Sequence, residues 1–261
     1  MRDYHVHTHF SDGKCSPREM VEAALAMGMD VLGFSDHGYT DFDGTYCMSA
    51  EEQMRYVREI RELAEEYQGN IRILCGIEQD LFAGMRPEGF DYAIGSVHYF
   101  RFGDRYVDVD HTAQILLDAA DEFCGGDIYR MAEIYYENVS RVVEVTNCDI
   151  IGHFDLITKH NEKFAFMDEN HPRYVAAWKK AADCLLSTNR PFEINMGAIS
   201  RGYKSKPYPA DPILTYLRDR GAQFILNSDS HHKDNLCYQF DRWGRMAKDL
   251  GLTMTDLHVN A

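Results

Sequence analysis

The feature that most constrains the fold is a regular alternation of short apolar runs with amphipathic segments along the chain. Seven runs rich in apolar and β-branched residues are typical of strands. In chain order they cover residues 3–7, 30–35, 71–77, 92–97, 149–153, 192–195 and 223–228. Nearly every run is followed by a helical pattern. The alternation therefore predicts an α/β fold with a parallel sheet joined by crossover helices.

Helix start signals support this alternation. Ser16-Pro17-Arg18-Glu19 and Ser49-Ala50-Glu51-Glu52 each have the pattern of a capping box. Further helices are expected from Asp127 toward Val145, from Pro172, from Asp211-Pro212, and over about residues 236–250. No Pro/Ser-rich linker divides the chain, so one domain over residues 1–261 is more economical than two. A closed barrel of this kind would carry its active site at the carboxyl ends of its strands.

Each predicted strand ends in an imidazole or a carboxamide or carboxylate group. These groups are His5 and His7, Asp36 and His37, Glu78, His98, His153, Glu193 and Asn195, and Asp229 and His231. Residues two apart on a strand point the same way, so His5 and His7 are expected to face the barrel interior together. Imidazole and carboxylate ligands without thiolate suit Zn²⁺, Fe²⁺ or Mn²⁺. Glu78, flanked by imidazoles, is suited to bridge two such ions.

Charge and cysteine content narrow the partners and the compartment. The chain has 27 Lys+Arg against 42 Asp+Glu, a net charge of −15, which disfavours nucleic acid and anionic membrane surfaces as partners. Its seven cysteines are widely spaced with no C-x-x-C pair, and no apolar signal-peptide core follows Met1. The expected compartment is the cytoplasm, and the oligomeric state is left open.

The ordered set of motifs resembles the PHP (polymerase and histidinol phosphatase) family. The resemblance extends from residue 5 to residue 231. It rests on His5-Val6-His7-Thr8, Ser11-Asp12-Gly13, Asp36-His37, Gly76-Ile77-Glu78, Gly95-Ser96-Val97-His98, Gly152-His153 and Ser228-Asp229-Ser230-His231. Residues 90–98 and Glu193-Ile194-Asn195 look most like the histidinol-phosphate phosphatase members. The resemblance implies a distorted (β/α)7, TIM-like barrel of the PHP type.

The resemblance also implies two or three divalent metal ions, whether zinc, iron or manganese. By position, the first would be held by His5, His7, Glu78 and Asp229, the second by Glu78, His98 and His153, and the third by Asp12, His37 and His231. Many relatives have a histidine near Asp12. Glu78, Asp229 and His231 are expected to be catalytic as well. Arg201 and Lys159 stand where similar enzymes have phosphate-binding side chains, the latter often an arginine.

The activity implied is hydrolysis of a phosphate monoester by a metal-bridging hydroxide. The expected substrate is L-histidinol phosphate, giving L-histidinol and phosphate in histidine biosynthesis. Three alternatives stay open: a PHP phosphoesterase for a nucleotide, sugar phosphate or phosphotyrosine, a non-catalytic metal-binding PHP module, and an amidohydrolase. The last would place a carbamylated lysine where this chain has Glu78.

Other residues have plainer interpretations. We expect Asp36 to orient a neighbour rather than bind metal, and Glu193 and Asn195 to hydrogen-bond loop backbone at the barrel mouth. Asp12 in Ser-Asp-Gly is also an ordinary turn residue, and Arg201 and Lys159 could be solvated loop cations. The proton donor to the leaving group is left open.

Overall fold

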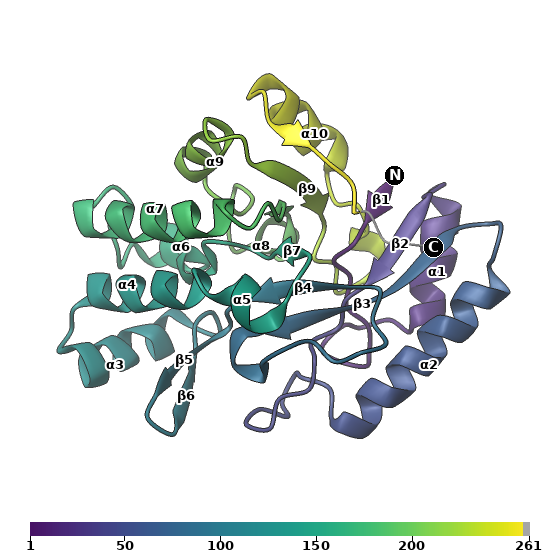
Figure 1. The fold of residues 1–261 in the computed structure, drawn as a ribbon, viewed down its shortest axis with the longest axis horizontal. Coiled ribbons are helices and arrows are strands. Elements are labelled where there is room, and N and C mark those ends of the chain that lie inside the picture. Colours follow the sequence, from purple (N-terminus) through teal and green to yellow (C-terminus); the bar gives the residue numbers. More distant parts are fainter. Residues whose placement is uncertain (258–261) are drawn as a thin grey trace.

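A curled parallel sheet forms the centre of the molecule (Figure 1). The computed structural model describes residues 1–257, and within them the main sheet has eight strands in the order β1-β2-β3-β4-β7-β8-β9-β10. Their bounds are Arg2–Asp3, Val31–Phe34, Arg72–Asp80, Tyr92–Ser96, Ile150–Ile151, Phe192–Asn195, Gln223–Asn227 and Thr253–Met254. All neighbouring pairs are parallel. The predicted α/β class is confirmed, and strands occur at all seven predicted positions.

Strands β1 and β9 approach each other at their carboxyl ends. Beyond β1, Val6 forms a parallel bridge with Ser230, which follows β9. The amide of His7 donates to the carbonyl of Ser230 (2.8 Å), and the amide of Ser230 donates to the carbonyl of His5 (3.1 Å). At the amino end, β10 pairs with β9 instead. The result is the distorted TIM-like barrel that the sequence predicts.

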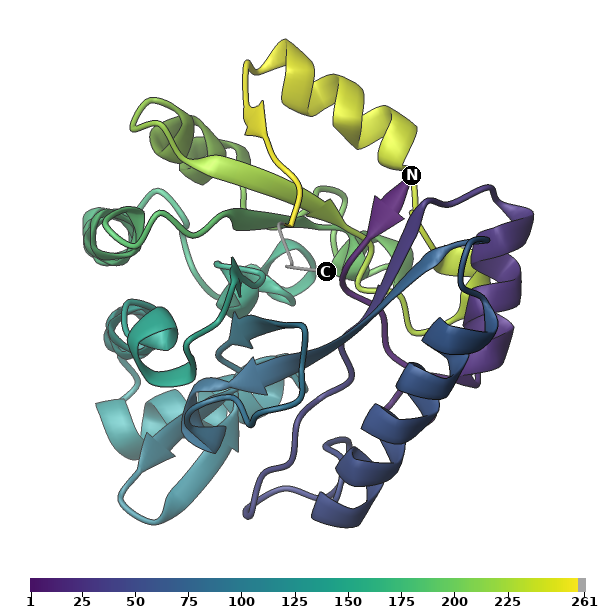
Figure 2. The same ribbon diagram turned by 45° about the vertical axis from the view of Figure 1, so that its right-hand side comes forward.

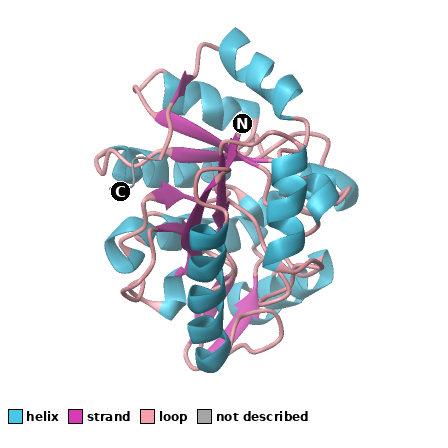
Figure 3. Cartoon of the chain, turned by 90° about the vertical axis from the view of Figure 1, so that its right-hand side faces the viewer, coloured by secondary structure: helices cyan, strands magenta, loops and turns pink. Residues whose placement is uncertain are grey.

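Helices surround this sheet, as Figure 2 and the side view of Figure 3 show. Their bounds are α1 Pro17–Ala26, α2 Ala50–Glu66, α3 Ala113–Cys124, α4 Ile128–Val139, α5 Val142–Thr146, α6 Asn161–Phe164, α7 Pro172–Leu186, α8 Gly197–Ser200, α9 Asp211–Arg218 and α10 Phe240–Asp249. Both predicted capping boxes form at the starts of α1 and α2. Within residues 1–257, no helix combines the length and apolar character needed to cross a membrane.

Several features differ from the sequence expectations, the first being that the main sheet has an eighth strand, β10, where seven strands were expected. The chain after β4 forms an antiparallel hairpin, β5 (Tyr99–Phe102) with β6 (Arg105–Asp108), followed by α3. The helix expected from Asp127 to Val145 is interrupted after Val139 and resumes as α5 at Val142. The N-cap of α9 is Ala210, whose side chain makes no capping hydrogen bond, so Asp211 lies inside the first turn.

Apolar side chains fill the part of the barrel interior that lies away from the carboxyl ends of the strands. One buried cluster contains Tyr4, Val31, Leu74, Tyr92, Ile94, Ile150 and Ile225. The Tyr92 hydroxyl lies 2.5 and 3.0 Å from the carbonyl oxygens of Tyr4 and Phe34. Gly76 leaves room for the Tyr92 ring, since a Cβ there would overlap it. These apolar side chains fill the barrel interior, while the cavity lined by polar side chains lies at the carboxyl ends of the strands.

Candidate metal centre and catalytic pocket

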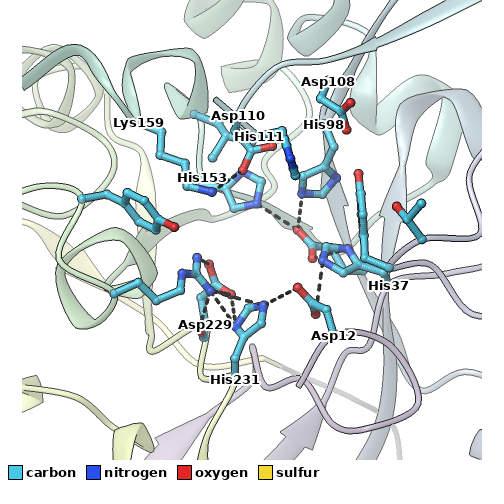
Figure 4. Close-up of a pocket in the computed structure, with 16 residues that line it drawn as sticks. Asp12, His37, His98, Asp108, Asp110, His111, His153, Lys159, Asp229 and His231 are labelled. Carbon is cyan, nitrogen blue, oxygen red and sulfur yellow. Dashed lines mark hydrogen bonds and ion pairs between the residues drawn. The ribbon is translucent and has the colours of Figure 1, made fainter. Parts of the chain in front are cut away.

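The barrel mouth holds a cavity of about 440 Å³ (Figure 4). The structure brings all nine predicted metal ligands to this mouth from separate strands and loops. The cavity wall is formed by Asp12, His37, Thr45, Tyr46, Glu78, His98, Asp108, Asp110, His111, His153, Leu156, Lys159, Arg201, Tyr203, Asp229 and His231. His5 and His7 lie beneath it and are fully buried.

Glu78 occupies the centre of the cluster and has polar neighbours on both carboxylate oxygens. Its Oε1 accepts a hydrogen bond from the Ser96 hydroxyl (2.6 Å) and lies 2.9 Å from His153 Nε2. His98 Nε2 approaches the same oxygen at 3.3 Å. This half of Glu78 therefore faces the two histidines predicted to hold the second metal with it.

The other oxygen of Glu78 faces a different set of histidines. Oε2 lies 3.0 Å from His37 Nδ1, 3.3 Å from His5 Nε2 and 3.5 Å from His7 Nε2. A carboxylate whose two oxygens address separate groups of imidazoles has the geometry of a bridging ligand.

Electrostatics keep Glu78 ionised in spite of its burial. Burial alone would raise the pKa of Glu78, but the imidazoles of His5 and His98, whose own pKa values are raised well above the usual value by the carboxylates around them, outweigh it and hold the pKa of Glu78 well below its usual value. Burial lowers the pKa of His37 to about 3. A neutral imidazole is the form that binds metal.

Three groups of side chains bring nitrogen and oxygen atoms within 4.8 Å of one another, close enough for each group to hold a metal ion. The groups are His5, His7 and Asp229; His37, Glu78 and His98; and His7, Asp12, His37 and His231. The third contains the whole predicted third site. Of the other two, the first lacks Glu78 of the predicted set, and the second has His37 in place of His153. His37 contacts Oε2 of Glu78, whereas His153 contacts Oε1.

Buried nitrogen atoms support a metal at this place. His5 Nε2 and both ring nitrogens of His7 are buried and make no hydrogen bond within the described residues. Unpaired buried polar atoms are costly, and each such group calls for an explanation. The donor set of imidazoles and carboxylates, with these nitrogens directed at Glu78 and Asp229, fits a divalent cation.

Glu193 holds His5 from below, a role that the sequence interpretation missed. His5 Nδ1 donates to Glu193 Oε1 at 2.6 Å, which leaves Nε2 directed at the cluster. The same carboxylate accepts hydrogen bonds from the His153 amide (2.9 Å) and from the side chains of Asn195 and Asn227 (3.0 Å each). The expected backbone contact of Glu193 is present as the hydrogen bond from the His153 amide, and the contact with the His5 ring comes in addition to it.

Two further carboxylates order the rim. Asp80 Oδ2 lies 3.3 Å from His98 Nδ1 and accepts a hydrogen bond from the His98 amide (2.8 Å). Asp36 accepts hydrogen bonds from the amide and hydroxyl groups of Thr8 and Ser11. As expected, Asp36 orients its neighbours, here the loop that carries Asp12. Nothing in the strand pattern pointed to Asp80, because its role depends on a neighbouring strand.

Arg201 and Lys159 both reach the cavity. Arg201 Nη2 donates to Asp229 Oδ2 at 3.0 Å, and Nη1 donates to His231 Nδ1 at 2.6 Å. Lys159 Nζ donates to Asp110 Oδ2 at 2.7 Å. The sequence interpretation also missed Tyr46 and Asp110, which come from the loop before α2 and the segment after β6. The unpredicted hairpin carries Asp110 to the rim.

Imidazoles and carboxylates clustered at the strand ends of a barrel are typical of metal-dependent hydrolases. Comparison with known proteins identifies the family. Residues 3–197 match the PHP domain, and the chain belongs to this family. It is 27% identical to a probable histidinol-phosphatase of Deinococcus radiodurans over 95% of this chain and 93% of that protein. It is 25% identical to the histidinol-phosphatase of Bacillus subtilis strain 168, covering 92% of this chain and 97% of that one.

A solved structure resembles the fold over nearly the full length. It is the histidinol phosphate phosphatase of Lactococcus lactis subsp. lactis Il1403, complexed with zinc, L-histidinol and phosphate. The TM-score is 0.72 at 22% identity, covering 99% of this chain and 96% of that chain. The likeness confirms the PHP-type barrel.

Proposed function

We propose that this chain is a metal-dependent phosphatase that hydrolyses L-histidinol phosphate to L-histidinol and phosphate in histidine biosynthesis. The observation that carries the proposal is the position of Glu78 between two groups of imidazoles, in a cavity that Arg201 and Lys159 also enter. The names of the full-length relatives in Deinococcus and Bacillus support the choice of substrate.

The metal ligands in this proposal are the nine residues expected from the sequence: His5, His7, Asp12, His37, Glu78, His98, His153, Asp229 and His231. We propose that they hold two or three divalent ions. The unpaired buried nitrogens of His5 and His7 support metal binding at this place, and zinc is the metal named with the Lactococcus protein. Such ions would supply Lewis acidity toward phosphoryl oxygens and would acidify a water molecule. Glu78, Asp229 and His231 are proposed as the catalytic residues among them.

The side chains of this protein have distinct tasks in the reaction. Glu193 fixes the ring of His5, and Asp80 fixes that of His98, so the imidazoles are oriented before substrate arrives. Arg201 presents a planar fork of N–H donors that suits the equatorial phosphoryl oxygens. Lys159 adds a second cation to the wall of the cavity. Donors fixed in advance stabilise charge that develops in the transition state.

We also propose that residues 1–261 act as one domain in the cytoplasm. Support for one domain is the eight-stranded sheet, whose strands lie between residues 2 and 254. Support for a reducing compartment is the wide spacing of the seven cysteines, with no C-x-x-C pair.

A substrate screen of the metal-loaded protein tests the proposal. We expect kcat/KM for L-histidinol phosphate to exceed that for nucleotides, sugar phosphates and phosphotyrosine by at least roughly a hundredfold, since even small differences of shape in an apolar pocket are discriminated by about that factor. A value no better than that for these esters would refute the substrate assignment. Absence of any phosphatase activity would refute the reaction class.

A further inference from the structure

Lys159 occupies a place where similar enzymes often use arginine, and it reaches the cavity already bound to a carboxylate. Its Nζ lies 2.7 Å from Asp110 Oδ2, and the side chains are only 14% and 21% exposed. The ammonium also lies 4.7 Å from the centroid of the Tyr203 ring. We propose that Asp110 is a positioning residue that holds Lys159 at the phosphate end of the cavity, an inference that rests on the proposed function.

The need for such a residue follows from the chemistry of lysine. An arginine presents a rigid fork that fixes its own orientation against a phosphoryl group. A lysine ammonium is a point charge on a flexible four-carbon stem and loses more rotamer freedom when it is held in one place. Asp110 and the Tyr203 ring restrict that stem before substrate binds, so less entropy is lost on binding.

Asp110 is itself fixed relative to the proposed metal ligands. The amide of the preceding residue, Val109, donates to the carbonyl oxygen of His98 at 2.8 Å, and Val109 is buried. The ring of His160, which follows Lys159, donates from Nε2 to the carbonyl oxygen of Asp110 at 2.9 Å. The segment after β6 and the loop that carries Lys159 and His160 therefore meet at Asp110. Because the segment that carries Asp110 is bonded to His98, Asp110 fixes the position of Lys159 relative to His98.

The pairing leaves Lys159 able to bind a phosphoryl oxygen. An ammonium group has three N–H donors. Within the described part of the chain Asp110 is the one side chain that accepts a hydrogen bond from Lys159. Both residues line the cavity, as Figure 4 shows. The carboxylate stays ionised, because Lys159 and the nearby His98 outweigh burial and lower the pKa of Asp110.

A double-mutant cycle on the metal-loaded protein tests this inference. The four proteins are wild type, Asp110→Asn, Lys159→Met and the double variant. Each is measured for inorganic phosphate Kd by calorimetry and for kcat and KM with L-histidinol phosphate and with p-nitrophenyl phosphate, which lacks an ammonium. Asp104→Asn is the matched control, since Asp104 lies exposed at the tip of the β5–β6 hairpin.

We expect Asp110→Asn to weaken phosphate binding and to lower kcat/KM about tenfold for both esters, which is typical for loss of a residue that orients a binding group. In the Lys159→Met background the same change should have no further effect, because the group it orients is gone. The thermal midpoint of Asp110→Asn should lie below that of the Asp104→Asn control, because the largely buried ammonium of Lys159 loses its carboxylate partner, so binding is measured at a temperature at which every variant is fully folded.

Three results would overturn the inference. The first is an equal loss from Asp110→Asn with and without Lys159. The second is tighter phosphate binding, which would mean that Asp110 masks Lys159. The third is a loss confined to L-histidinol phosphate, which would mean that Asp110 reads a cationic part of the substrate. The phosphate Kd values test the role of Asp110 even if L-histidinol phosphate proves a poor substrate. A wrong substrate assignment can therefore be distinguished from a wrong role for Asp110. Absence of phosphate binding by the wild-type protein would overturn both.

Discussion

At the scale of single residues, the site depends on carboxylates that do not face the cavity. Glu193 is fully buried and accepts four hydrogen bonds, from His5, His153, Asn195 and Asn227. Burial alone would raise the pKa of Glu193, but His5 outweighs it and lowers the pKa. The carboxylate therefore stays an acceptor on both oxygens and fixes the direction of His5 Nε2.

Replacing Glu193 by glutamine should damage the metal centre. All four partners of Glu193 are donors, and an amide has one acceptor oxygen, so the new NH₂ group must face another donor. We expect Glu193→Gln to lower metal affinity and kcat/KM by about ten- to a hundredfold. Metal titration and steady-state kinetics measure this, with Glu88→Gln at an exposed site as control. Wild-type metal affinity in Glu193→Gln would contradict the role of Glu193.

The sequence predicts which residues lie at the barrel mouth, but it does not predict which side chains contact one another there. Strand periodicity indicates that His5 and His7 point inward, and the structure places them there. Periodicity says nothing about which side chain from another strand lies beneath a histidine. The roles of Glu193 under His5 and of Asp80 beside His98 depend on the neighbours in the sheet and its curvature, so neither could be read from spacing along the chain.

At the scale of elements, the short helix α8 packs directly against a predicted metal ligand. A Cβ built on Gly197 would lie 2.7 Å from Asp229 Cγ and 2.7 Å from Arg201 Nη2. Glycine at the start of α8 thus allows Asp229 and Arg201 to pair above it. Helix α8 therefore allows Asp229 and Arg201 to take their positions because Gly197 has no side chain.

Gly197→Ala should displace Asp229 and Arg201 without unfolding the barrel. We expect kcat/KM to fall roughly a hundredfold, because a displacement of about 1 Å in a reacting group has that cost. Gly244→Ala is the matched control: Gly244 lies in α10 with open space around its Cα, and alanine there should raise stability by up to about 1 kcal/mol. Equal activity in the two variants would contradict the close packing of α8 on Asp229.

Elements with a strong local signal were predicted well, and those that depend on tertiary contacts were not. The capping boxes at Ser16 and Ser49 mark helix starts that the structure confirms. The β5–β6 hairpin and the two-residue strand β10 have no comparable signal. The strand β10 exists because β9 has a free edge at the amino end of the barrel, which only the assembled sheet reveals.

At the scale of the whole molecule, the barrel separates an apolar interior from a polar mouth. The net charge of −15 would repel a phosphate ester from the surface as a whole. Arg201 and Lys159 at the mouth, with divalent ions held by the rim, would reverse that charge locally. An acidic protein can therefore bind a phosphate ester if metal ions bind at the strand ends. The proposed activity depends on that metal binding.

The most direct test measures metal content and L-histidinol phosphate hydrolysis together, in chelator-treated protein, in protein reloaded with zinc, iron or manganese, and in reloaded Glu78→Gln. We expect the treated protein to be inactive and the reloaded protein to recover activity with two or three ions bound per chain. Glu78→Gln, whose single acceptor oxygen cannot face both groups of imidazoles, should recover neither. Full activity in metal-free protein, or wild-type metal content and activity in Glu78→Gln, would contradict the account.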